Sequence, residues 1–359
     1  MKGNDSPINK KMKYMNAKKL FTTLAICVAL SLQTALMAVT ITPSKRYVTA
    51  PVKVTAAFTG LCTETAIDIE YTVGSENVKL YAPDNLVKYI KVTVSKGVLT
   101  VGYSENMNIN GKHRTKLVVS APNVTKFVVY SAGDINILSD INTSADVTLT
   151  TNSAGDISAK NISSKGNVKL TVNSAGDIEA GNISGNKVEL CTSSAGDISA
   201  RIVKAQGDAR LIVNSVGDVE VSEVISGGSA ILTSNSMGGA KANAVSSETV
   251  TLQCNSAGEA KASNIEATTV NCSLTSSGDI SASGFCSKAF LTSFGVGNVN
   301  ASRLEATDVN VLLQSVGNIK CAPIRTLFGR RRNKGRVYYS GAPEVLVTND
   351  FQGDAVKHI

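Results

Sequence analysis

The sequence predicts an all-β protein, a single-stranded parallel β-helix with about ten coils of about 20 residues each. A five-residue frame, written Ser153-Ala154-Gly155-Asp156-Ile157 in one copy, recurs ten times between Ser131 and residue 319. Successive copies start 19 to 22 residues apart, and apolar residues alternate with polar ones on both sides of the frame. A fixed period near twenty favours a stacked solenoid over a globular domain.

The third place of the frame is always glycine. The ten residues are Gly133, Gly155, Gly176, Gly196, Gly217, Gly238, Gly258, Gly278, Gly297 and Gly317. We interpret them as structural turn glycines. Stacked turns with positive φ would select glycine, because a Cβ atom would strain every turn.

Three apolar patterns follow each glycine. The first alternates, as in Ile157 and Ala159, and predicts a strand with one buried face. A column after a short bend comes next, and a second alternating strand such as 168–172 completes the coil. The column consists of Ile162, Ile183, Val203, Val224, Val245, Ile265, Phe285 and Leu304. A helical solenoid is excluded, because the turns are Gly, Ser and Asn and no window has the 3.6-residue period.

The residue after the glycine is usually acidic. The acidic residues are Asp134, Asp156, Asp177, Asp197, Asp218, Glu259 and Asp279, and Gly239, Asn298 and Asn318 replace them in three copies. One interpretation is turn capping, in which each side chain accepts a backbone N–H two residues on. The other is a ligand or cation ladder, because like charges about 4.8 Å apart repel and carboxylate oxygens suit calcium. The dense GGxGxD spacing of calcium-binding β-rolls is absent, so we favour capping and expect no cofactor.

A second polar ladder precedes the serine of the frame. Its members are Asn152, Asn173, Asn214, Asn235 and Asn255. Stacked asparagines bond along a stack axis, so we interpret these residues as structural.

Residues 1–38 have the pattern of a secretory signal peptide. Five lysines between Lys10 and Lys19 precede an apolar run from Leu20 to about Leu36, and Ala38 is the expected last residue before cleavage, with Ala35 as the alternative. Met12 and Met15 are alternative start residues. Removing the segment lowers the formal charge from +8 to +3, and no surface that combines aromatic and basic residues is visible, so we expect no nucleic-acid partner. We expect no transmembrane segment after cleavage.

The segments on the two sides of the repeat region lack the clean repeat. Residues 39–130 are β-rich, with turns such as Asn110-Gly111, and predict an irregular N-terminal cap on the repeat region, residues 131–320. Residues 321–359 predict a C-terminal cap with a basic loop, which contains Arg330, Arg331, Arg332, Lys334 and Arg336. This loop is either a solvated surface loop or a site for an anionic partner such as lipopolysaccharide or an acidic glycan.

The six cysteines after residue 38 do not predict disulfides. Cys254, Cys272 and Cys321 fall on inward columns and Cys191 on an outward position, so the pairs lie in different columns or distant coils. We expect small core residues instead. With His113 and His358 as the only histidines, no His/Cys metal site has a known spacing.

The parts of the chain follow one another in a recognisable order: the strands around Ile67 to Leu80, then 97–101, then 117–122, the SAGD-type repeats, and the closing 339–345. In this order of parts the chain resembles the putative auto-transporter adhesin, head GIN domain family. The resemblance covers the chain from about Val48 onward and implies a β-helical cell-envelope or surface protein. It carries over no binding residues.

The function expected from these features is non-catalytic: an exported adhesin or interaction scaffold. Its partner would be a glycan, an envelope component or a host surface protein, and its place the periplasm or surface of a Gram-negative bacterium, or the medium. Two alternatives stay open. One is a polysaccharide lyase or hydrolase, which would need clustered catalytic side chains in a groove. The other is a scaffold that assembles end to end through sheet edges.

Overall fold

The structure is a computed structural model that describes residues 39–104, 107–347 and 356–358. It divides into two units. One comprises residues 1–43 and 104–112, and its described strands β1 (Val39–Ile41) and β8 (Met107–Ile109) pair in parallel. The other comprises residues 44–103 and 113–359 and holds the remaining strands. The predicted signal peptide lies outside the described residues.

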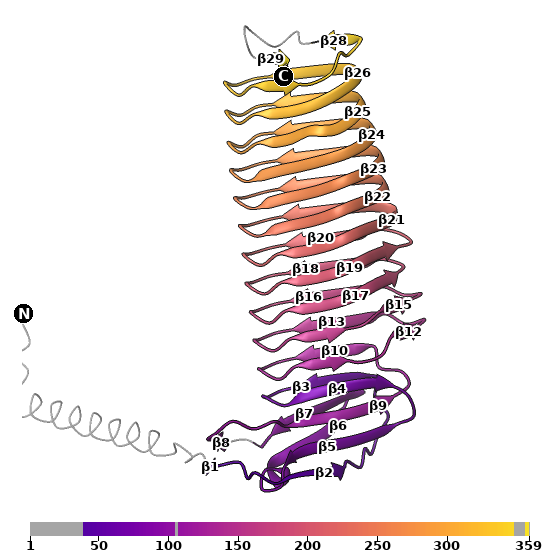
Figure 1. Ribbon diagram of the computed structural model, residues 1–359, viewed down its shortest axis with the longest axis vertical. Coiled ribbons are helices and arrows are strands. Elements are labelled where there is room, and N and C mark those ends of the chain that lie inside the picture. The colour runs from indigo at the N-terminus through magenta and orange to yellow at the C-terminus, as the bar shows by residue number, and fades with distance from the viewer. Residues whose placement is uncertain (1–38, 105–106, 348–355, 359) are drawn as a thin grey trace, which may run out of the picture. The chain divides into compact units, whose positions relative to one another are not determined.

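The second unit is a parallel β-solenoid of about eleven turns, as the sequence predicts (Figure 1). Each coil crosses three sheets, which we call first, second and third in chain order after the glycine. The first sheet contains β4 (Asp68–Val73), β11 (Ile135–Ile137) and β14 (Ile157–Ala159), and the second begins with β12 (Ile141–Thr143) and β15 (Ile162–Ser164). The third contains β10 (Lys126–Val129), β13 (Val147–Thr151), β16 (Val168–Val172), β18 (Val188–Thr192) and β20 (Ala209–Val213).

Later strands bend around the corners without interruption. Strands β17 (Ile178–Gly185) and β19 (Ile198–Ala205) belong to both the first and second sheets. The next ones cross all three sheets: β21 (Val219–Ser234), β22 (Gly239–Cys254), β23 (Glu259–Leu274), β24 (Asp279–Ser293), β25 (Val299–Leu313) and β26 (Ile319–Arg331).

The parallel register places like residues over like residues. Ile157 pairs with Ile135 and Ile178, and Ile178 pairs with Ile198, so each inward column is a continuous apolar stack. Ile, Val, Leu and Ala fill this core, and within residues 131–320 no aromatic side chain is buried. The buried rings Tyr71 and Phe127 lie near the N-terminal end, 5.4 Å apart.

One residue of the predicted third column is wrong. Phe285 is 49% exposed, and Gly284 pairs with Ile265 and Leu304 in its place. The coil that begins at Gly278 is the shortest among the ten copies of the frame, with 19 residues to Gly297, and the missing residue shifts Phe285 to the outer face. Gly284 has φ +125°, and a Cβ there would overlap the backbone of Ile265. Glycine therefore permits the shortened corner.

The coil stack begins before residue 131. Strands β3 (Gly60–Thr63) and β7 (Val98–Tyr103) pair in parallel and extend the third sheet, and β9 (Lys116–Ala121) extends the first. Their order is unusual, since β3 lies between β7 and β10, and β4 lies between β9 and β11. The first coil of the chain is thus inserted between the two that follow it.

Antiparallel strands add to this end of the solenoid. Strand β6 (Ile90–Ser95) forms a hairpin with β7, while β5 (Asn77–Pro83) pairs with β2 (Tyr47–Pro51) and β9. A short 3-10 helix, η1 (Val87–Tyr89), joins β5 to β6. Among the described residues no helix has the length and apolar character that a membrane span requires.

The stack also continues past residue 320. Arg330 and Arg331 end strand β26, where they pair with Leu312 and Leu313, so they are not part of a loop. Only Arg332, Lys334 and Arg336 of the predicted basic loop lie between strands. Strand β27 (Val337–Tyr339) then extends the first sheet and β28 (Val345–Val347) the third, and β29 (Val356–His358) pairs with β27.

Candidate functional site

The glycine column owes its composition to a close backbone approach. None of its members has positive φ, so the torsional explanation predicted from the sequence is wrong. A Cβ built on each of the ten would overlap a carbonyl oxygen of the preceding coil, that of Ile67 for Gly133 and that of the previous glycine for the other nine. The glycine N–H groups bind there too, as where Gly176 donates to the Ser153 carbonyl at 2.7 Å. The turns stack so closely that no side chain fits.

The column has an eleventh member, Gly335, which the frame did not reveal. A Cβ on Gly335 would overlap the Gly317 carbonyl, and the Gly335 N–H donates to the Ser315 carbonyl at 2.9 Å. Arg336 stands where aspartate usually follows, and the spacing from Gly317 is 18 residues. The basic stretch therefore forms one more coil turn.

Buried hydroxyl groups bind the glycine carbonyls from inside the coil. Thr192 Oγ1 donates to the Gly196 carbonyl and Ser234 Oγ to the Gly238 carbonyl, each at 2.6 Å. The Cys254 thiol lies in the same column and donates to the Gly258 carbonyl at 3.1 Å. All six cysteines from Cys62 to Cys321 are free, and only Cys191 is not buried, as predicted.

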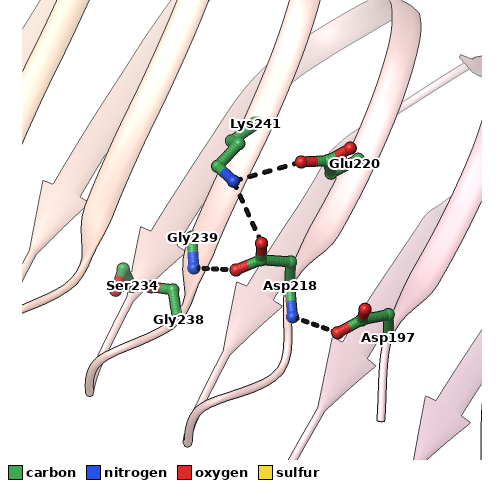
Figure 2. A network of polar contacts seen from close by, with 7 residues as sticks. All are labelled: Asp197, Asp218, Glu220, Ser234, Gly238, Gly239 and Lys241. Atoms are coloured by element: carbon green, nitrogen blue, oxygen red, sulfur yellow. Dashed lines mark hydrogen bonds and ion pairs between the residues drawn. The ribbon is translucent and has the colours of Figure 1, made fainter. Parts of the chain in front are cut away.

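The acidic column forms a ladder between coils. Asp177 Oδ1 accepts the N–H of Asp197 at 2.8 Å. Asp197 Oδ1 accepts the N–H of Asp218 at 2.7 Å, and Figure 2 shows this second bond. Asp134 and Asp156 bind the next coil in the same way, as do Asp279, Asn298 and Asn318 near the other end. The expected bond two residues on is therefore wrong, since each side chain bonds the equivalent N–H one coil away. The side chains of this column therefore bond each coil to the next one.

The asparagine ladder runs parallel to it. Asn173 Nδ2 donates to Asn152 Oδ1 at 2.8 Å, and Asn255 Nδ2 donates to Asn235 Oδ1 at 2.7 Å. These bonds confirm the structural interpretation of the stacked amides.

The acidic ladder breaks at Gly239 (Figure 2). Asp218 Oδ1 accepts the Gly239 N–H at 2.6 Å, while Lys241 Nζ lies 3.0 Å from Asp218 Oδ2 and 3.1 Å from Glu220 Oε1. A Cβ on Gly239 would lie 2.6 Å from Lys241 Cε, so the lysine uses the space an aspartate would need. The hydrogen bond to Asp218 raises the pKa of Lys241. One cation thus neutralises the end of the longest acidic run.

Glu259 does not form the hydrogen bond between coils that the aspartates form. The N–H of Asp279 donates to the Gly258 carbonyl at 3.1 Å, whereas an aspartate would accept it in the regular ladder. The Glu259 side chain lines a groove described below. Among the described residues, no group of three or more His, Cys, Asp or Glu side chains is arranged to hold a metal ion.

A groove follows the edge between the first and second sheets. It encloses about 980 Å³ and takes lining residues from seven successive coils, between Ile137 and Lys261. Its length is therefore about 29 Å, six strand spacings of about 4.8 Å. Small residues at the edge, including Ala180, Gly181 and Ala200, leave the space. A second groove of about 350 Å³ lies further along the first sheet and includes Asn298, Asn300 and Asn318.

Charged side chains line the first groove. The cations are Lys160, Arg201, Lys241 and Lys261, and the anions are Glu179, Glu220 and Glu259. Lys241 and Glu220 pair with each other, but Lys160, Glu179, Arg201 and Lys261 have no ion-pair or side-chain hydrogen-bond partner within the described chain. A binding surface has this property, because its polar groups stay available to a ligand. The sequence did not reveal the groove, although its small residues and charges recur at fixed distances after the glycine.

The solved structures to which this chain is similar include a putative adhesin from Bacteroides fragilis NCTC 9343, 19% identical, with 89% of this chain and all of that chain covered and a TM-score of 0.34. A putative adhesin from Parabacteroides merdae ATCC 43184 is 15% identical over 84% of this chain and 98% of that one, with a TM-score of 0.36. A putative lipid binding protein from Parabacteroides distasonis ATCC 8503 is 13% identical over 89% and 100%, with a TM-score of 0.32.

No curated protein matches the chain. The model of one family does, over residues 57–224 and again over residues 221–343, which together span most of the solenoid. The matched residues include every turn glycine and the whole groove. The chain therefore belongs to the putative auto-transporter adhesin, head GIN domain family.

Proposed function

We propose that the protein is an exported, non-catalytic adhesin that holds an extended glycan in the groove between the first and second sheets. The observation that carries the proposal is the set of charged groups without protein partners along this groove, Lys160, Glu179, Arg201 and Lys261. Family membership supports an adhesin and a place outside the cytoplasm.

The shape of the groove favours a linear ligand. It runs across the strands for about 29 Å without an inserted loop at either side, so a chain molecule can contact several coils at once. Both charge signs line it, which suits a ligand with hydroxyl groups and charges of both signs better than a strongly anionic one. A glycan that carries carboxylate and amino groups beside its hydroxyl groups has this chemistry, and it is the ligand that we propose.

The test is binding of the chain without residues 1–38 to an array of glycans and matrix proteins, with calcium present and then chelated. Arg201→Glu should weaken glycan binding at least about tenfold, the usual effect of losing one charged contact. Lys204→Glu is the matched control, since Lys204 is an exposed cation on the same strand β19 but outside the groove. Equal losses in both variants, or no glycan binding, would contradict the proposal.

The alternative is a polysaccharide-active enzyme that uses the same groove. Its support is the Glu220–Lys241 pair at 3.1 Å, which places an acid and a base side by side. Incubation of bound glycans with the protein, followed by assay of new chain ends, separates the two functions. Product formation that Glu220→Gln abolishes would favour the enzyme.

Export has its own test. The mature protein should be recovered outside the cytoplasm and begin at Val39, or at Leu36 if cleavage follows Ala35. N-terminal sequencing of protein from fractionated cells measures this directly, and an intact Met1 in the cytoplasmic fraction would contradict export.

A further inference from the structure

The outer face of the third sheet changes composition in its last regular coils. In the coil that begins at Gly238, the outward residues are Thr251, Gln253 and Asn255, and earlier coils are similarly polar or mixed. In the coils of Gly278, Gly297 and Gly317, large apolar or cationic residues take six of the nine corresponding places. The three sets are Phe290, Thr292 and Phe294; Asn310, Leu312 and Gln314; and Phe328, Arg330 and Arg332.

The strand register brings these residues together. Asn310 pairs with Phe290 on one side and with Phe328 on the other, and Leu312 pairs with both Thr292 and Arg330. The patch therefore spans three neighbouring strands, about 10 Å across at about 4.8 Å per strand. We call Phe290, Phe294, Leu312, Phe328, Arg330 and Arg332 the aromatic–arginine patch.

Core packing does not account for the aromatic rings. Phe290 is 41% exposed, Phe294 46% and Phe328 37%, and they project from the face opposite the buried columns. The Arg330 guanidinium lies 5.7 Å from the centre of the Phe328 ring. Cation and aromatic ring thus form one surface, and exposed rings gathered in this way mark an interaction site.

The charge around the patch is one-sided. Residues 325–336 contain six cations and no carboxylate, although the chain without its first 38 residues carries a formal charge of only +3. Asp308 pairs with Arg325 through two hydrogen bonds, at 2.6 and 3.0 Å. The partner that complements this end of the solenoid is therefore anionic.

We propose that the aromatic–arginine patch docks onto an anionic phospholipid surface. Phenylalanine on the apolar face of an interfacial element enters the boundary between lipid headgroups and acyl chains, and arginine binds phosphate oxygens in a bidentate manner. A flat sheet face presents both kinds of side chain at one level, as a membrane surface requires. An acidic glycan would complement the arginines and can stack a sugar ring on a single phenylalanine. Three phenylalanines on one sheet face match an extended apolar layer better, and a membrane provides such a layer. The patch lies apart from the groove, so the proposal is independent of the glycan-binding function.

The test measures partition of the chain without residues 1–38 onto vesicles. Vesicles with about one third phosphatidylglycerol in phosphatidylcholine should bind it, and pure phosphatidylcholine should not. The double variant Arg330→Gln/Arg332→Gln should lower the partition coefficient about 30-fold, since each cation near an anionic membrane contributes about fivefold. Phe290→Ser/Phe328→Ser should lower it about tenfold or more, because two apolar rings no longer leave water.

The matched control removes two cations from the same outer column at the other end of the sheet, with Lys169→Gln/Arg210→Gln. Its partition should match that of the unmodified chain, and thermal melts should show that every variant folds. An equal loss in this control would overturn the proposal. A lower partition coefficient for the arginine variant with no change for the phenylalanine variant would also overturn it. So would a soluble anionic glycan that the protein binds as tightly as the vesicles and that prevents vesicle binding.

Discussion

Gly176→Ala tests the close stacking of the turns most directly. The added Cβ would lie 2.9 Å from the carbonyl carbon of Gly155 and 3.0 Å from the Ser153 carbonyl oxygen, and closer still to the Gly155 oxygen. All three atoms belong to the backbone, so no side chain can rotate away. The two coils have to separate, and the bond from the Gly176 N–H to the Ser153 carbonyl lengthens.

The cost should be at the upper end for overpacking, about 3 kcal/mol. Unfolding entropy near the melting temperature is about 2.1 cal/mol/K per residue, or about 0.6 kcal/mol/K for about 300 folded residues, so the melting temperature should fall by about 5 °C. Gly207→Ala is the control. Its Cβ would lie 3.4 Å from the nearest atom, an ordinary contact, so the expected change is within about 0.5 kcal/mol.

Calorimetry of both variants gives the melting temperatures, and hydrogen exchange gives the position of the damage. Because each coil contacts only its neighbours, faster exchange should be confined to the coils on either side of Gly176. Equal melting temperatures for the two variants would refute the steric explanation of the glycine column.

Three further predictions concern titratable groups. Millimolar calcium should leave the melting temperature unchanged. Asp177→Asn should keep or slightly raise the melting temperature, because the amide oxygen can still accept the N–H of the next coil. A calcium-induced rise in melting temperature that the variant abolishes would establish a cation ladder instead. Desolvation raises the pKa of Asp68, so the ionised side chain destabilises the fold. Asp68→Asn should therefore raise the melting temperature at pH 7, and this increase should shrink as the pH falls through the raised pKa toward 3.8. An increase in melting temperature that stays constant with pH would contradict this explanation. Burial raises the pKa of Cys272 and Cys286 to about 12, so in the native protein a maleimide should modify Cys191 alone among the six cysteines, and mass spectrometry of labelled peptides would expose any other site.

The repeat made most of the fold predictable. Glycine spacing and alternating apolar residues repeat ten times, so errors in one copy are corrected by the others. Where the repeat changes, prediction failed: Phe285 was misplaced because its coil is a residue shorter, and Gly335 was missed because Arg336 replaces the aspartate. Local sequence does not report either change, since both depend on pairing with a neighbouring coil.

The candidate sites were less predictable, because they combine residues from several coils. The groove needs the small side chains of Ala180 and Ala200 to lie beside charges from other coils, and the aromatic–arginine patch needs Phe290 and Phe328 to meet across Asn310. From the sequence alone, each of these residues is an ordinary surface position. Only the register shows which ones are neighbours.

The inserted position of the first coil has a consequence for how the chain acquires its fold. Strands β3 and β4 need partners on both sides, and the last of these, β11, ends at Ile137. A chain that emerges N-terminus first therefore cannot complete this inserted coil until Ile137, more than a third of the way along its 359 residues, has been delivered. After that point each further stretch of about 20 residues can pair with a strand edge that is already formed. We therefore expect folding to start slowly and then to proceed from the N-terminal coils toward the C-terminus, the order in which a threaded polypeptide becomes available.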